Sequence, residues 1–185
     1  MVKCDFLIDM ERFFKNIRKA ILLRLIHNVG LPFLIRFRNP KPWYYSQAQL
    51  RTFPAGTFGR ELADMLDKNK FELLRNYEHH DAKHVLLGYG MDEEGEVRMQ
   101  FFFLGNRRYS FPVLSTVAAG IVLMPDKWKI FLKEYRKGRS VAPVAKWDIA
   151  RMVNEETECV RRKLGICEIR NANIFPDRSA DHAAL

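Results

Sequence analysis

Three of the five histidines in this chain lie within six consecutive positions, as His79, His80 and His84. His80 and His84 are four residues apart, and Asp81 precedes His84 by three. In a helix, side chains with these spacings project from one face and converge within a single turn. Two neutral imidazoles and a carboxylate are a common ligand set for a borderline divalent cation. Spacing alone leaves a solvated helix start as an equal alternative, and we expect His79 to be solvated.

The helix that carries these residues should end at the Gly-Tyr-Gly sequence of positions 88–90, because glycine commonly caps helices. A tight turn there would return the chain so that Glu96 brings a second carboxylate to the same patch. The segment from Glu96 to about Leu104 is rich in phenylalanine and could form a strand. We interpret it as a helix, because its neighbours are helical and Glu96 must face the histidines.

Asp81 holds the position of the glutamate base in the related zinc-protease pattern His-Glu-x-x-His. Its side chain is one carbon shorter, so a role as a ligand or a close partner of a ligand is as plausible as a role as the base. The predicted site therefore has Asp81 as its catalytic residue and four metal ligands, namely His80, Asp81, His84 and Glu96.

The order His-Asp-x-x-His, eleven residues and Glu resembles the signature of the coenzyme Q (ubiquinone) biosynthesis proteins of the fourth complementation group. The similarity covers roughly residues 50–166 and includes Thr-Phe-Gly-Arg-Glu-Leu at 57–62, Gly-Glu at 95–96 and Arg-Arg-Lys-Leu-Gly-Ile at 161–166. Arg107 and Arg108 depart from the resemblance, since that region is often more apolar in the family.

The resemblance implies that the ion is Zn2+ and that the substrate is a polyprenylated hydroxybenzoate. Fe2+ is the alternative ion, because two histidines and one carboxylate are also a ligand set that suits iron. It also implies a reaction of ubiquinone biosynthesis, oxidative decarboxylation at ring carbon one, in which a hydroxyl replaces the carboxylate. The protein would then be a metal-dependent decarboxylase, a carbon–carbon lyase. A second interpretation is a non-catalytic scaffold that binds prenyl lipids and organises other quinone-biosynthesis enzymes.

Helical periods dominate the rest of the chain, and its 48% apolar and 12% aromatic residues suit a globular core. We expect an all-α, single-domain bundle of about seven helices over residues 1–169, followed by a mobile polar tail at 170–185. Residues 111–124 carry no charge, and they predict a buried central helix beside a cleft for a prenyl chain. Further helices are predicted from 57 to about 67, from 125 to 138 and from about 146 to 164.

The net charge is +9, and residues 1–41 hold nine Lys/Arg against three Asp/Glu. This segment predicts a basic amphipathic helix, which can lie in a membrane interface or pack into the core. Docking on an anionic membrane surface suits a protein that takes a prenylated substrate. Nucleic acid is not an expected partner, because no recognition motif accompanies the charge.

Cys4, Cys159 and Cys167 show no zinc-finger spacing, and their odd number favours a reducing compartment. The N-terminus lacks the pattern of a secretory signal or a transit peptide. We therefore expect a bacterial cytoplasmic protein, peripheral on the inner face of the cytoplasmic membrane, and we expect a homodimer. Neither a glycine-rich phosphate loop nor a Gly-x-Ser-x-Gly nucleophile sequence is present, which argues against nucleotide binding and serine hydrolysis.

Overall fold

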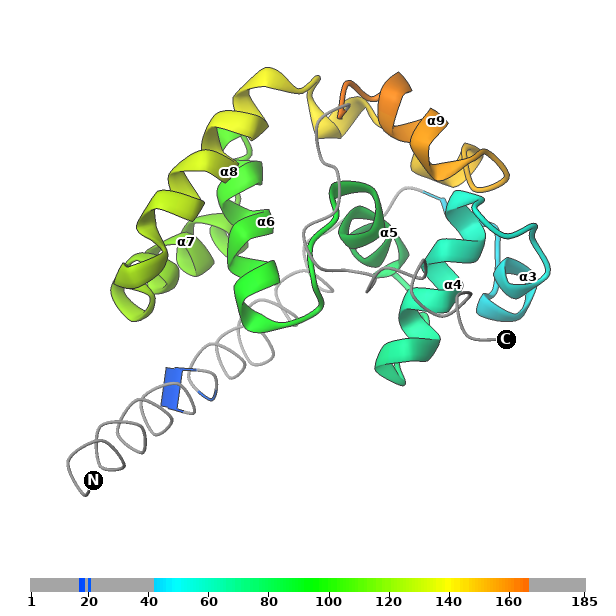
Figure 1. The fold of residues 1–185 in the computed structure, drawn as a ribbon, viewed down its shortest axis with the longest axis horizontal. Helices are drawn as coiled ribbons and strands as arrows, with labels where there is room; N and C mark the ends of the chain where they lie inside the picture. The colour runs from blue at the N-terminus through cyan, green and yellow to red at the C-terminus, as the bar shows by residue number, and fades with distance from the viewer. Residues whose placement is uncertain (1–16, 19, 21–41, 167–185) are drawn as a thin grey trace, which may run out of the picture. The chain divides into compact units, whose positions relative to one another are not determined.

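A computed structural model describes Ile17, Arg18, Ala20 and residues 42–166, and this part of the chain is helical (Figure 1). Among the described residues there are seven α-helices, α3 to α9, with three short 3-10 turns and no strand. An isolated antiparallel bridge joins Thr57 and Glu156. The predicted all-α fold class is therefore confirmed.

Internal contacts divide the chain into two compact units. The first contains residues 1–39 and 100–139, and the second contains residues 40–99 and 140–185. Most of the predicted basic segment at 1–41 and all of the predicted tail at 170–185 lie outside the described residues. The predicted domain boundaries consequently stay a prediction. No helix within the described ranges is long and apolar enough to cross a membrane.

The second unit holds the predicted site and is built around one short helix. Its helices are α3 (Gln47–Arg51), α4 (Phe58–Asn69), α5 (Glu78–Leu87), the first turns of α6 (Glu93–Gly105) and α9 (Thr157–Lys163), with 3-10 turns at Val144–Lys146 and Ile149–Arg151. α5 packs against α4, against α9 and against the second of these turns. All residues of α5 except Glu78 and His80 are buried, so α5 is the central helix of this unit.

Local sequence signals explain where two helices of this unit begin and end. Thr57 caps α4 as predicted, and its hydroxyl accepts a hydrogen bond from the Arg60 amide at 3.4 Å. Gly88 ends α5 as predicted, in the left-handed conformation (φ 72°) that glycine adopts at little cost. The segment that begins with Glu96 is helical in α6, again as predicted.

The predicted continuous helix over residues 146–164 is wrong. The structure has 3-10 turns followed by the short α9, because carbonyls between them accept hydrogen bonds from α4 instead of from their own segment. The carbonyls of Val153 and Glu155 accept hydrogen bonds from the amides of Gly59 and Phe58, both at 2.8 Å. These two amides are in the first turn of α4, where backbone donors have no partner inside their own helix. Capping α4 therefore interrupts the helix that the sequence pattern predicts.

The first unit contains the second half of α6, α7 (Phe111–Leu123), a 3-10 turn at Pro125–Lys127 and α8 (Trp128–Ser140). The absence of charge predicts that α7 is a buried central helix. The structure buries one face, through Pro112, Val113, Thr116, Val117 and Gly120. The opposite face is exposed, through Phe111, Leu114, Ile121 and Val122. Full burial was therefore a wrong prediction, because an uncharged helix need not be surrounded by its own chain.

Two glycines let α6 and α8 approach each other closely. A Cβ on Gly138 would collide with the Phe102 carbonyl, and a Cβ on Gly105 would collide with the Tyr135 carbonyl. The Asn106 side-chain amide also donates a hydrogen bond to the Gly138 carbonyl at 3.0 Å. α8 continues past Gly138, where the sequence predicts its end, because this glycine serves packing rather than capping.

The substitution Gly138→Ala should destabilise the protein. Alanine is normally favoured over glycine inside a helix by about 1 kcal/mol, but here the added methyl group would force α6 and α8 apart. We expect the free energy of unfolding, measured by urea denaturation, to fall by about 1–3 kcal/mol. Lys133→Ala, on the exposed surface of α8, is the control and should change it by less than about 0.5 kcal/mol. Unchanged or increased stability of Gly138→Ala would contradict the close helix contact.

Candidate metal centre

Three of the four predicted ligands converge in the second unit. Nε2 of His80 lies 3.3 Å from Oε2 of Glu96, and Nε2 of His84 lies 3.2 Å from the same oxygen. The two Nε2 atoms are themselves 3.2 Å apart. Among the described residues, these three side chains form a group that could hold a metal ion. The predicted convergence of the three is therefore present, while metal binding itself stays a prediction.

The spacing of these three atoms fits a small divalent ion. Three ligand atoms at the corners of a tetrahedron, each about 2.0 Å from the ion, lie about 3.3 Å apart. On one face of an octahedron, ligand atoms about 2.1 Å from the ion lie about 3.0 Å apart. The observed separations of 3.2 and 3.3 Å are close to both values, so the triangle fits a small divalent ion of either geometry. A tetrahedral ion held by these three ligands would keep a fourth position for water or substrate.

A backbone carbonyl selects which ring nitrogen of His84 faces Glu96. Nδ1 of His84 lies 3.3 Å from the carbonyl oxygen of Tyr89. In the neutral ring Nδ1 therefore carries the proton and donates it, and Nε2 keeps its lone pair for a metal. The left-handed Gly88 places Tyr89 there, and the Tyr89 amide donates to the His84 carbonyl at 3.1 Å. The residue types in the sequence do not show which backbone carbonyl bonds to a histidine. The glycine at the end of the helix was the one sequence signal near this contact.

Glu96 is positioned by the start of α6. The Asp92 carboxylate accepts a hydrogen bond from the Gly95 amide at 2.7 Å, as an N-cap residue does. A Cβ on Gly95 would collide with the Gly90 carbonyl, so the backbone folds tightly on itself before the helix begins. This compact turn brings Glu96 back to the histidines of α5. The negative charge of Glu96 is also favoured by the positive end of the helix dipole.

Burial and mutual attraction act in opposite directions on the buried members of this site. Burial raises the pKa of Glu96, but the charges and hydrogen bonds of His80 and His84 outweigh this effect and hold the pKa well below its usual range. Burial lowers the pKa of His84, but the hydrogen bond to Glu96 and its negative charge outweigh this effect and leave that pKa raised. Both shifts favour the charged pair of a protonated imidazole and a carboxylate, and a cation that binds here competes with that proton.

Asp81, the fourth predicted ligand and the predicted catalytic residue, is not a member of the group of three. It is buried, and burial raises the pKa of its carboxyl, while the charges of His80 and His84 act in the opposite direction. The charges of His80, His84 and Glu96 therefore act on Asp81, but its carboxyl oxygens are not among the ligand atoms that these three residues bring together. Its role as a ligand or as a catalytic residue stays a prediction.

His79 does not lie on a solvated face, and that prediction was wrong. The side chain is buried, and its ring packs edge-on against Trp43 with ring centroids 5.4 Å apart. The segment before α3 covers this side of α5. The residues near His79 in the sequence could not predict this contact, because Trp43 lies far from His79 along the chain.

Arg161 connects α9 to the end of the histidine helix. Its Nε donates to the Leu86 carbonyl at 3.1 Å, and its Nη2 donates to the Val85 carbonyl at 2.8 Å. Both carbonyls belong to the last turn of α5, where backbone carbonyls have no amide donor within their own helix. A cation at a helix C-terminus is also favoured by the helix dipole. The sequence showed the basic run at 161–163 only as part of a resemblance, and spacing could not reveal this contact.

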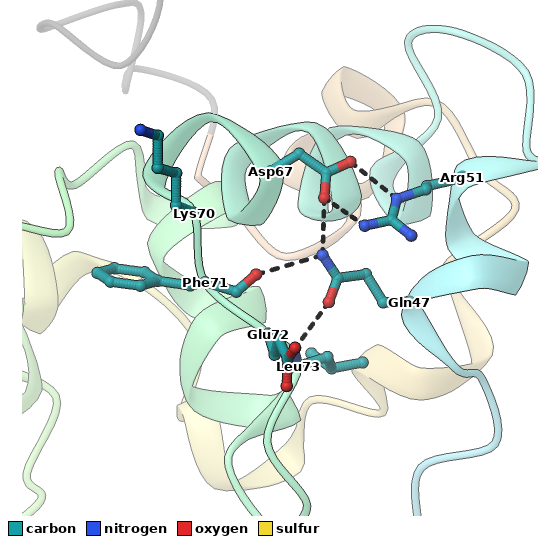
Figure 2. A pocket seen from close by; sticks show the side chains of 7 residues that line it. All are labelled: Gln47, Arg51, Asp67, Lys70, Phe71, Glu72 and Leu73. Carbon is teal, nitrogen blue, oxygen red and sulfur yellow. Dashed lines mark hydrogen bonds and ion pairs between the residues drawn. The ribbon is translucent and has the colours of Figure 1, made fainter.

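A separate hollow of the second unit lies between α3, α4 and the segment that leads into α5. It is lined by Gln47, Arg51, Asp67, Lys70, Phe71, Glu72 and Leu73 (Figure 2). Gln47 donates to Asp67 at 2.8 Å and accepts a hydrogen bond from the Leu73 amide at 2.9 Å. Arg51 forms an ion pair with Asp67. None of the predicted site residues lines this hollow. Its hydrogen bonds join α3 to α4 and to the segment that leads into α5.

Fold and centre together define an all-α protein in which two histidines of one helix and a glutamate of the next form a candidate metal centre. No family model and no curated protein matches the chain. The fold is similar to the crystal structure, at 2.85 Å resolution, of a Nostoc punctiforme PCC 73102 protein provisionally named a ubiquinone biosynthesis protein. The TM-score is 0.54, the identity is 21%, and the match covers 85% of this chain and 82% of that chain. The comparison establishes a shared fold.

The affinity of the protein for Zn2+ should increase as the pH rises from about 6 to about 8. The pKa of His84 is raised, so the ring keeps its proton to a higher pH and the ion must displace that proton. Isothermal titration calorimetry in buffers of different ionisation enthalpy measures the affinity and the protons released. Glu96→Gln should weaken binding and flatten its pH dependence, whereas Glu93→Gln, in the same turn of α6, should do neither. An affinity that does not change with pH would contradict this competition.

Replacing Arg161 by lysine keeps the charge but removes the planar fork that reaches two carbonyls at once. Arg161→Lys should lower the free energy of unfolding by about 1–3 kcal/mol. It should also weaken zinc binding about tenfold, because the helix that carries His84 loses its anchor. Thermal denaturation and calorimetry measure the two effects, with the exposed neighbour substitution Arg162→Lys as the control. Wild-type zinc affinity in Arg161→Lys would show that this contact does not support the centre.

Proposed function

We propose that this chain catalyses the metal-dependent oxidative decarboxylation of a polyprenylated hydroxybenzoate at ring carbon one, a step of ubiquinone biosynthesis. The observation that carries the proposal is the triangle of His80, His84 and Glu96, whose dimensions fit a small divalent ion held by three protein ligands. The similarity in fold to a protein provisionally named for ubiquinone biosynthesis supports the choice of pathway. The His-Asp-x-x-His signature with its distant Glu supports the same choice.

The proposed reaction replaces a carboxyl group on the ring by a hydroxyl group. The bond between ring carbon one and the carboxyl carbon breaks, and carbon dioxide leaves. One atom of dioxygen becomes the new hydroxyl, and the other leaves as water, which requires two electrons and two protons from a reductant such as a reduced flavin or nicotinamide. A bound divalent ion would supply positive charge beside a carboxylate or phenolate oxygen of the substrate, where negative charge develops.

The groups of the chain itself would orient the reacting atoms and move protons. The Tyr89 carbonyl fixes the ring of His84, so that Nε2 points into the centre. Asp81 lies near both histidines, and burial raises the pKa of its carboxyl. A carboxyl with a raised pKa can both donate and accept a proton during turnover. We therefore assign Asp81 the role of catalytic acid and base.

The proposal includes a cofactor, a location and partners. Zn2+ is the favoured ion, because the resemblance of the sequence implies it, and Fe2+ is the alternative, because two imidazoles and one carboxylate also suit iron. A polyprenylated substrate resides in a membrane, so we place the protein in the cytoplasm, peripheral on the inner face of the cytoplasmic membrane. We also propose a homodimer that contacts other quinone-biosynthesis enzymes.

A non-catalytic scaffold that binds prenyl lipids and organises other enzymes is the second candidate function. The exposed apolar residues of α7 favour it, because they offer a lipid-compatible surface that contains none of the predicted ligands. Against it stands the ligand set, since structural zinc sites are usually closed by four ligands and rich in cysteine.

Turnover and metal binding should separate in the substitution Asp81→Asn. Purified protein is loaded with Zn2+ or Fe2+, supplied with oxygen, a two-electron reductant and a detergent-dispersed short-chain prenyl hydroxybenzoate, and the release of carbon dioxide is followed. We expect Asp81→Asn to keep zinc affinity and to lose about 10²- to 10⁴-fold in rate. Asp64→Asn, a carboxylate on α4 outside the site, is the control and should keep both properties.

His84→Ala should lose both metal and turnover, because it removes a predicted ligand. If the wild-type protein binds zinc and prenyl lipid but releases no carbon dioxide with either metal, the enzyme proposal fails and the scaffold interpretation replaces it. If Asp81→Asn turns over at the wild-type rate, the acid–base role of Asp81 fails while the metal centre stands.

A further inference from the structure

α7 presents an exposed apolar face in the first unit. Phe111, Leu114, Ile121 and Val122 are exposed by 52%, 46%, 45% and 75%. Residues at these positions recur at helical spacings on one side of α7, and the exposed Ala118 lies between them. Large apolar side chains gathered on one exposed surface are typical of a contact site rather than of ordinary protein surface.

Exposed aromatic side chains flank this face along the chain. Tyr109 precedes α7 and is 65% exposed, and Trp128 follows α7 at the start of α8 and is 48% exposed. Tyrosine and tryptophan have an apolar ring and a polar group, and they are enriched where a hydrocarbon layer meets water. Both therefore suit the boundary of a surface that enters lipid.

The sequence around α7 is strongly basic, although α7 itself carries no charge. Residues 100–139 contain eight Lys/Arg and two Asp/Glu, a net charge of +6. Both acidic residues are engaged within the unit. Asp126 lies 3.0 Å from Arg18, and the buried Glu134 lies 3.2 Å from Lys137. Exposed basic side chains before and after α7 include Arg107, Lys129, Lys133 and Arg136.

We propose that the exposed face of α7, formed by Phe111, Leu114, Ala118, Ile121 and Val122, docks into the surface of an anionic lipid bilayer. The apolar side chains would enter the boundary between headgroups and acyl chains, and the flanking basic residues would contact lipid phosphates. α7 has thirteen residues, so it lies along the membrane rather than across it.

Charge complementarity favours lipid over a second copy of this chain. Two copies joined through α7 would each bring the exposed basic residues that precede and follow α7, and like charges repel. An anionic bilayer would instead attract those residues and would bury the apolar face at the same time. The inference rests on the proposed membrane location but not on the proposed reaction.

Vesicle flotation of the full chain tests this docking surface. The probes are vesicles of phosphatidylcholine alone and of phosphatidylcholine mixed with phosphatidylglycerol. The wild-type protein should float with the anionic vesicles, and its binding should weaken as salt is added. Leu114→Glu and Val122→Glu should each lower partitioning at least about tenfold, because each replaces a lipid-inserted apolar side chain by a charge.

Leu74→Glu is the matched control, because Leu74 is a similarly exposed leucine (53%) in the second unit, and it should float as the wild type does. Thermal denaturation should show wild-type stability for all three variants, since the replaced side chains are exposed. Zinc affinity and turnover with detergent-dispersed substrate should also be unchanged, so failure of docking is distinguishable from failure of the proposed reaction.

Wild-type flotation of Leu114→Glu and Val122→Glu, or no flotation of the wild-type protein, would overturn the proposal. Sedimentation velocity gives the other decisive outcome. If the wild-type protein is a dimer, Leu114→Glu is a monomer and vesicle binding is equal in both, a second copy covers α7 and the lipid assignment is wrong.

Discussion

The burial of one carboxylate constrains most of the second unit. Glu96 retains only 13% of its side-chain exposure, and a carboxylate without water needs positive charge and hydrogen bonds close by. The two imidazoles supply both, and they can reach the same oxygen because they are four residues apart on one helix. The carboxylate must come from the next helix, so the turn between α5 and α6 has to be compact. Gly88, in the left-handed conformation, and Gly95, which lies against the Gly90 carbonyl, make that turn sterically feasible.

The sequence predicted the features that depend on local spacing and local backbone conformation. The histidine helix, its glycine end, the helical start of α6 and the convergence of His80, His84 and Glu96 all follow from periodicity and from turn chemistry. The all-α fold class follows from the same helical periods along the chain. The position of Asp81 could not be fixed in this way. The helical spacing places it on the side of His84, but spacing does not show whether its short side chain reaches the other ligand atoms or stops beside them.

Features that depend on distant segments were not predictable from one sequence. The carbonyls of Val153 and Glu155 cap α4 and break an expected helix, and Trp43 buries a histidine that was expected to be solvated. In both cases a residue far away in the sequence makes the contact, by accepting a backbone hydrogen bond or by covering a side chain. Local sequence patterns do not predict such contacts. The exposed face of α7 belongs to the same class. A lack of charge indicates that a segment is more stable away from water. It does not indicate whether the segment packs against its own protein or against another apolar phase.

The guanidinium that closes the end of α5 comes from a residue 75 positions further along the chain. Both histidines and Glu96 leave the ribosome well before that residue during synthesis, since domains emerge from the N-terminus. The end of the histidine helix therefore stays unanchored until α9 has been made and has docked. An ion that arrived earlier would meet imidazoles on a fraying turn. Under the proposed function, zinc acquisition therefore belongs to the final stage of maturation, and a nascent chain halted before α9 would compete poorly for scarce zinc in the cell.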